Sequence, residues 1–266
     1  MPVITTNTAA NSALRYLNIN SSEQTNALNK VASGSRITRA SDDAAGLAVA
    51  TKLQADVGVL GQASTNASHG QSVLETADGA LSSIASILER MKVLAAESMD
   101  GALSDTERGY ASTEYSDLNT ELTSVISQTK FNNQALLSGY SASFLVGTSN
   151  TDTISFSLSS LSLGLSGTSV GSSANASTAL GSLDAAISNL ASMQASVGAY
   201  ESQFNYRTNV ITNSRENMDA AQSAIADCDV AEAQSEFSSA QVKTNAAIAA
   251  LAQANSMPQQ LLSLLQ

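Results

Sequence analysis

The sequence predicts a mainly α-helical protein: an elongated antiparallel helical bundle with coiled-coil helices at its two ends and a small β-hairpin insert. Three observations support this fold class. Small or apolar side chains recur three and four residues apart along most of the 266 residues, which places them on one face of a helix. Aromatic residues make up only 4% of the chain, which favours thin helical packing over a thick globular core. The period falls to two between residues 139 and 173, as in strands.

The two ends of the chain carry matching heptads. Because neither stripe can be covered by further chain, we expect each to pack on the other end or on other molecules. One member of the second stripe, Pro258, lacks an N–H, so we expect a kink or a missing backbone hydrogen bond there. The first stripe contains Leu14, Leu17, Leu28 and Val31, with Ser21 and Gln24 between them, and the second contains Phe237, Ala240, Thr244, Ala247, Leu251, Ala254, Pro258, Leu261 and Leu265.

A long helix is predicted from the carboxylates Asp42 and Asp43 to about Met99. Ser41 and these carboxylates suit a helix N-terminus, where they meet unpaired N–H groups and the positive end of the helix dipole. Glycines inside the helix weaken it by roughly 1 kcal/mol each relative to alanine. Its predicted buried row is Leu53, Val57, Leu60, Ser64, Ala67, Gln71, Leu74, Ala77, Leu81, Ile84, Leu88, Met91 and Leu94, and its glycines include Gly58, Gly61, Gly70 and Gly79.

A second helix should follow the break at Asp100-Gly101. Ser104 and Glu107 have the spacing of a capping box, in which each side chain satisfies the other's backbone N–H. The short connection predicts that this helix packs antiparallel to the long one. Its predicted face carries Ala111, Tyr115, Leu118, Leu122, Val125 and Thr129.

The segment 139–173 predicts a β-hairpin. Ile154, Phe156 and Leu158 alternate with serine after a turn-like stretch at residues 148–152, and alternation of this kind marks a half-buried strand. The helical spacing of apolar residues, three and four apart, returns at about Ala176 and continues to a joint near residues 227–229. The terminal heptads follow that joint.

Composition argues against several classes of function. A net charge of −11 disfavours nucleic acid and anionic membranes as partners. The last 23 residues carry no charge, but Asn and Gln interrupt every apolar run, so they do not resemble a spanning helix. The first residues lack the pattern of a Sec-type signal peptide. With one Cys, one His and no catalytic or phosphate-binding motif, we expect no catalytic residues, no metal site and no cofactor.

Four separated stretches resemble bacterial flagellins. They are ASGSRITRASDDAAGLAVA at 32–50, ILERMKVLA at 87–95, TKFNNQALL at 129–137 and LAQANSMPQQLLSLL at 251–265. They occur in the family's order, and the resemblance covers about residues 1–140 and 175–266. It implies a structural subunit, not an enzyme, that leaves the cell through the flagellar type III system and self-assembles outside it into the filament used for swimming.

The resemblance also implies a layered subunit. Residues 1–33 with 229–266 would form a coiled-coil inner tube, residues 34–138 with 175–228 an outer tube, and residues 139–174 a short surface segment in place of the large outer domains of many flagellins. Four residues, Arg36, Arg39, Asp42 and Asp43, would lie in the link between the layers. The expected filament core residues on the terminal helices are Leu14, Leu17, Leu28, Val31, Phe237, Leu251, Leu261 and Leu265.

Further partners follow from the same resemblance. They are other copies of the chain, an export chaperone at the C-terminal segment, and the filament cap and hook-junction proteins. In the family, an animal innate immune receptor recognises an Arg, a Leu one helical turn away, and a Glu on the adjacent helix. The matching positions here are Arg90, Leu94 and Glu114.

Two alternative functions are compatible with these patterns. A hook–filament junction protein would share the same architecture, and a secreted coiled-coil interaction protein would share the heptads. The C-terminal match at residues 251–265 favours the filament flagellin.

Overall fold

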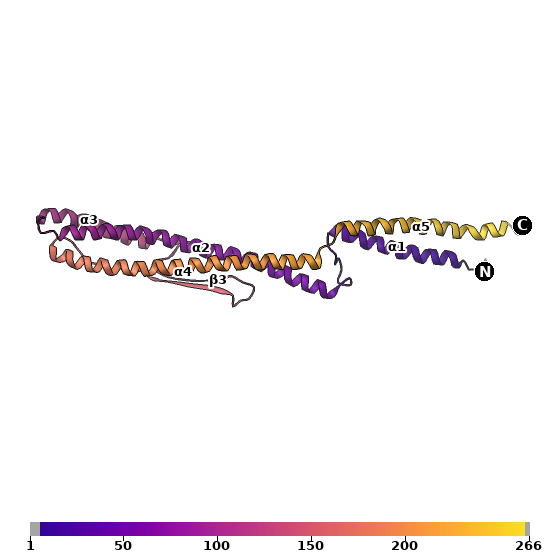
Figure 1. The fold of residues 1–266 in the computed structure, drawn as a ribbon, viewed down its shortest axis with the longest axis horizontal. Coiled ribbons are helices and arrows are strands. Elements are labelled where there is room, and N and C mark those ends of the chain that lie inside the picture. Colours follow the sequence, from indigo (N-terminus) through magenta and orange to yellow (C-terminus); the bar gives the residue numbers. More distant parts are fainter. Residues whose placement is uncertain (1–5, 264–266) are drawn as a thin grey trace. The chain divides into compact units, whose positions relative to one another are not determined.

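The computed structural model describes residues 6–263, and side chains up to residue 260. Within these residues the fold is mainly α-helical with two small antiparallel strand pairs (Figure 1), so the predicted fold class is confirmed. The helices are α1 (Thr8–Ser33), α2 (Ala44–Ser98), α3 (Asp105–Gln128), α4 (Ser173–Ala226) and α5 (Val230–Ser263); the strands are β1 (Lys130–Phe131), β2 (Gln134–Ala135), β3 (Ser138–Leu145) and β4 (Thr153–Ser160).

The chain divides into two compact units. We call Met1–Ala55 with Asn217–Gln266 the terminal unit, and Asp56–Glu216 the central unit. The boundaries between the two units fall inside α2 and inside α4. The boundaries predicted between the inner and outer layers fall instead in the connections between α1 and α2 and between α4 and α5. Each unit is described separately below.

The core of the central unit lies between α2, α3 and α4. The row predicted on α2 is buried from Leu60 onward, apart from the half-buried Ser64 and Gln71. Helix α3 contributes Tyr115 and Leu122, as predicted. It runs antiparallel to α2, because Arg90 of α2 contacts Glu114 of α3 while the end of α2 contacts the start of α3. The α4 side of this core is formed by Leu183, Ala186, Leu190, Met193, Val197 and Phe204.

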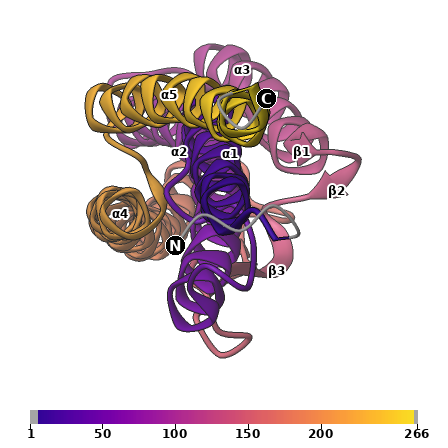
Figure 2. The same cartoon turned by 90° about the vertical axis from the view of Figure 1, so that its right-hand side faces the viewer.

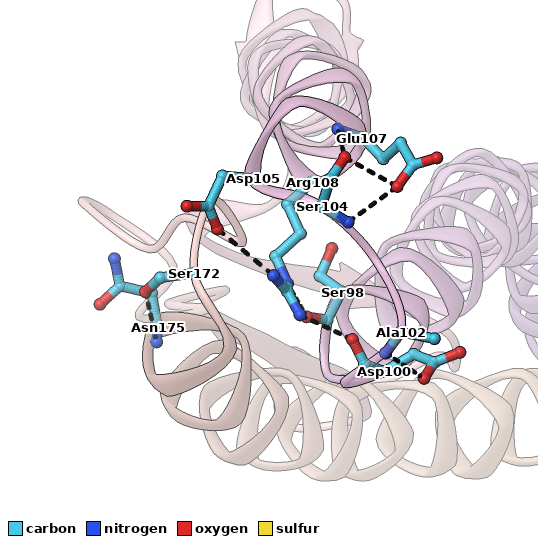
Figure 3. Close-up of polar contacts among 9 residues, drawn as sticks. All are labelled: Ser98, Asp100, Ala102, Ser104, Asp105, Glu107, Arg108, Ser172 and Asn175. Atoms are coloured by element: carbon cyan, nitrogen blue, oxygen red, sulfur yellow. Dashed lines mark hydrogen bonds and ion pairs between the residues drawn. The ribbon is translucent and has the colours of Figure 1, made fainter.

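The turn between α2 and α3 is held by two sets of polar contacts (Figure 3). The predicted capping box is present: the Ser104 N–H donates to Glu107 Oε2 at 2.7 Å, and the Glu107 N–H donates to Ser104 Oγ at 3.4 Å. The bonds that the Ser104 backbone and side chain donate hold the pKa of Glu107 below its usual value. The second contact was not predicted. Arg108, almost fully buried, donates from Nε to the carbonyl oxygen of Ser98 at 2.9 Å and from Nη2 to that of Asp100 at 2.6 Å.

Strands β3 and β4 form the predicted hairpin. Tyr140 pairs with Leu158, and Phe144 pairs with Ile154. The side chains of Ile154, Phe156 and Leu158 are buried, while the serines between them are exposed. Alternate burial therefore follows the period of two in the sequence.

An aromatic cluster attaches the hairpin to α4. The ring of Phe156 lies 5.8 Å from Phe144, 5.7 Å from Tyr200 and 6.1 Å from Phe204, measured between centroids. Helix α2 passes so close to this cluster that a Cβ at Gly70 would lie 2.6 Å from the ring of Phe204. A glycine in the middle of a helix normally weakens it, and here it provides the space for that ring.

Polar residues recur once per heptad on α4 where it packs against α2. Gln194, Glu201 and Thr208 on α4 are each half-buried. Burial, followed by the charges of Asp78 and Glu75 on α2, raises the pKa of Glu201. This polar row therefore places a carboxyl group where its charged form is disfavoured.

One small hairpin was not predicted. Strands β1 and β2 are joined by Asn132 and Asn133, whose φ angles are 47° and 66°. A two-residue turn with both residues in the left-handed region suits asparagine or glycine. The Asn-Asn pair is the sequence signal that could have revealed this turn.

Candidate assembly surface

Helices α1 and α5 of the terminal unit lie side by side and antiparallel, as Figures 1 and 2 show. Lys30 Nζ lies 3.6 Å from Glu236 Oε2, and Lys243 Nζ lies 3.9 Å from Glu23 Oε2. These ion pairs are largely exposed, so each contributes about 0–1 kcal/mol. The pairing must therefore rest mainly on the side chains between the helices.

The row predicted on α5 faces α1. Ala240, Ala247 and Ala254 are buried, and Phe237 and Leu251 are half-buried. Alanine at these positions lets the two helix backbones approach closely. The side chain of Leu261 and all of Leu265 lie outside the described residues, so their expected role stays a prediction.

The row on α1 differs in part from the predicted one. Leu17 and Val31 are half-buried, but Leu14 is 46% exposed and Leu28 is 49% exposed. Smaller residues take their places against α5. The alanines of α5 let the two helix backbones approach closely, and this close approach leaves no room for large side chains of α1 between them. The row that turns inward is Ala10, Ala13, Leu17, Asn20, Gln24, Ala27 and Val31.

Several large apolar side chains of the helix pair nevertheless remain exposed. Exposed large apolar side chains on a helix are candidates for burial against another molecule. We call this set the outer apolar residues: Leu14, Ile19 and Leu28 on α1, and Val242, Ile248 and Met257 on α5.

The joint of the terminal unit connects the ends of α1 and α4. Gly34 caps α1 in the left-handed conformation at φ 68°. Its carbonyl accepts from the Cys228 N–H at 3.0 Å, and the Arg36 N–H donates to the Ala226 carbonyl at 2.7 Å. Arg36 Nη2 also donates to the Ile225 carbonyl at 2.6 Å. The joint is thus a short antiparallel contact between the two chain segments that lead to the terminal helices.

The other linker residues organise the turn before α2. Asp42 Oδ2 accepts from the Thr38 hydroxyl at 3.0 Å and from the Arg39 N–H at 2.9 Å. These bonds hold the pKa of Asp42 below its usual value, and the bond from the Thr38 hydroxyl has the largest effect. Asp43 Oδ1 accepts from the Gly46 N–H at 2.8 Å, which satisfies a free amide of the first turn of α2. The Arg39 side chain is exposed.

The three residues predicted for receptor recognition lie in the central unit. Arg90 Nε donates to Glu114 Oε1 at 2.7 Å, and both side chains are about half exposed. Leu94 is only 2% exposed and belongs to the core. The structure therefore brings Arg90 and Glu114 together at the surface, but not Leu94.

Two family models match this chain. Residues 4–142 match the N-terminal helical region of bacterial flagellin, and residues 180–265 match its C-terminal helical region. The chain belongs to the bacterial flagellin family. A flagellin of Halalkalibacterium halodurans is 33% identical over 99% of this chain and 100% of its own length. A flagellin of Listeria innocua is 34% identical over 98% of this chain and 99% of its own length.

A solved structure shares the fold. It is described as that of a flagellar hook-associated protein from Vibrio parahaemolyticus, with a TM-score of 0.61 and 13% identity, and it covers 70% of this chain and 100% of its own length. At that identity the likeness concerns the fold alone. Relatives from Halalkalibacterium halodurans, Listeria innocua and Bacillus subtilis that match nearly the whole chain are named flagellins.

As a flagellin, this chain is a structural subunit that is exported and self-assembles into the bacterial flagellar filament for swimming. The prediction of function is confirmed at this level. The filament of its relatives lies outside the cell. None of the helices within residues 6–263 has a stretch apolar enough to cross a membrane.

Proposed function

We propose that α1 and α5 form the inner tube of the filament, with residues 1–33 and 229–266 as the inner layer. Residues 34–138 with 175–228 form the outer layer, and residues 139–174 form its surface segment. The observation that carries this proposal is the set of outer apolar residues, which a single chain leaves uncovered on both paired helices. Leu14 and Leu28 are already about half covered, so burying the rest of each against a neighbouring copy contributes about 1 kcal/mol to association.

The linker residues have a defined part in this proposal. Arg36 ties the two segments of the joint together, while Asp42 and Asp43 shape the turn into α2. The backbone of Arg39 is bonded within this turn, and its side chain is exposed. These contacts hold the connection between the two proposed layers together.

Three classes of partner follow from the exposed surface. An export chaperone covers the apolar face of α5, including Val242 and Ile248, before assembly. The filament cap and hook-junction proteins cover the faces left open at the two ends of the polymer, because a helical polymer of identical subunits always ends in unpaired surfaces.

Leu28→Glu tests the assembly surface. We expect the critical concentration for polymerisation to rise about tenfold or more, because a charge replaces a side chain that neighbouring copies would bury. Sedimentation of filaments over a range of protein concentrations measures it. Ser22→Glu is the matched control, since it adds the same charge at an exposed polar position of α1. Equal critical concentrations for the two variants, with unchanged helicity, would reject the proposed surface.

An animal innate immune receptor is a further proposed partner. The exposed Arg90–Glu114 pair supports it, because the pair joins α2 and α3 into one charged surface site. Leu94 then acts from the core, by fixing the helix that carries Arg90.

Arg90→Ala tests this partner with purified monomer in a receptor-reporter assay. We expect the half-maximal concentration to rise about tenfold, the usual size of losing a charged contact at an interface. Arg215→Ala, which removes an exposed arginine from α4, should leave the response unchanged. No response to the unaltered chain at saturating concentration would end the proposal.

A further inference from the structure

Pro258 leaves one carbonyl of α5 without its helical donor. The chain continues as a helix through this residue to Ser263, but proline has no N–H to donate to the carbonyl four residues earlier. That carbonyl belongs to Ala254, which is buried in the row facing α1. The missing helical bond predicted from the sequence is therefore located in the α1–α5 contact.

Asn7 supplies the missing donor from the other helix. Its Nδ2 donates to the Ala254 carbonyl at 2.8 Å. The Oδ1 of the same side chain accepts from the Ala10 N–H at 3.0 Å, which caps α1. One side chain thus satisfies a free amide of α1 and a free carbonyl of α5.

The alanine row of the α1–α5 packing does not by itself specify the alignment. Helix α5 presents a buried alanine to α1 at every seventh position: Ala233, Ala240, Ala247 and Ala254. A slip of one heptad would place alanine where alanine stood before at these positions, although it would exchange Phe237 and Leu251 with Thr244 and Pro258 in the neighbouring positions. The two ion pairs are largely exposed and distinguish the alignments poorly.

We propose that Asn7 and Pro258 form a register lock that selects one alignment of α1 and α5 from those related by whole heptads. After a slip of seven residues, Asn7 would face the carbonyl of Ala247, which already has a helical donor in the Leu251 N–H. The Ala254 carbonyl would then be buried without a donor. A single polar side chain in a heptad interface can fix register in this way.

Intramolecular disulfides measure the register. In a Cys228→Ser background, the pair Ala27→Cys with Ala240→Cys reports the observed alignment, since both residues line one groove between the helices. The pair Ala27→Cys with Ala233→Cys reports the slip of one heptad that would bring Asn7 opposite Ala247. Cross-linking yields are compared in the soluble chain and in filaments, where intramolecular products are separated from intermolecular ones by their size.

Asn7→Ser is the decisive variant, because serine keeps the capping oxygen but is too short to reach Ala254 as well. We expect the ratio of slipped to observed cross-links to rise about tenfold. In a Pro258→Ala background, where residue 258 regains its N–H, adding Asn7→Ser should change that ratio less than twofold. Asn18→Ser, at an exposed position of α1, is the control and should leave the ratio unchanged.

Several outcomes would overturn the lock. These are an unchanged ratio for Asn7→Ser, an equal change with and without Pro258, and no cross-link at the observed alignment in the parent chain. The lock rests on the helix pairing and not on the proposed inner tube. If Leu28→Glu polymerised normally, the assembly surface would be rejected while the cross-link ratio still decided the lock.

Discussion

Arg108→Met is expected to lower the free energy of unfolding of the central unit by about 3 kcal/mol, because bonds from a charged donor are worth roughly 1.5–3 kcal/mol each when buried. The substitution keeps much of the side-chain volume but leaves the carbonyls of Ser98 and Asp100 without the guanidinium. The ion pair with Asp105 adds little, since that carboxylate is almost fully exposed.

Thermal denaturation of the unpolymerised chain, followed by circular dichroism, measures this loss. Hydrogen exchange should show it first at the end of α2 and the start of α3. The melting temperature of Arg108→Lys should lie between those of Arg108→Met and the unaltered chain, because one ammonium group cannot reproduce the planar set of donors of a guanidinium. Arg215→Met, at an exposed position, is the control. If both methionine variants melted alike, the role given to Arg108 would be wrong.

Gly70→Ala should destabilise the same unit by about 2 kcal/mol. Overpacking a core costs about 1–3 kcal/mol or more, and better helix propensity returns up to about 1 kcal/mol. The added Cβ would lie 2.6 Å from two atoms of the Phe204 ring. That ring is fully buried and lies edge-on to Phe144 and Phe156, so it has little room to move.

Gly79→Ala provides the matched control in the same helix. A Cβ there would meet nothing within 4 Å, so we expect a gain of about 0.5–1 kcal/mol. The two variants should therefore melt on opposite sides of the unaltered chain, by a few degrees each for a unit of this size. A stabilising effect of Gly70→Ala would contradict the close packing described between α2 and Phe204.

The helices themselves were predictable because their signals are local. The capping box at Ser104 and Glu107 starts α3 where the spacing places it, and the joint before Val230 ends α4 as predicted. The spacing of apolar residues three and four apart identified the buried face of α2 and of α5. Each of these depends on residues within one or two helical turns of one another.

The partners of individual side chains were not predictable in the same way. Leu14 and Leu28 fit a heptad, but so do Ala13 and Ala27, and the small residues of α5 favoured the second row. The burial of Arg108 depends on the path of the turn before it, which no local pattern in the sequence records. The bond from Asn7 to the Ala254 carbonyl joins residues near opposite ends of the chain, so no local pattern predicts it.

The sequence by itself determined the helices, the hairpin, the joint near residue 228 and the membership of the flagellin family. These are recorded in periodicity, caps and motifs, which are properties of neighbouring residues. The tertiary structure alone decided which face of α1 meets α5, why Gly70 is a glycine, and which donor serves the carbonyl that Pro258 leaves free. Those outcomes depend on contacts between residues far apart in the chain, and a repeating pattern of small residues allows several alignments that only such contacts can distinguish.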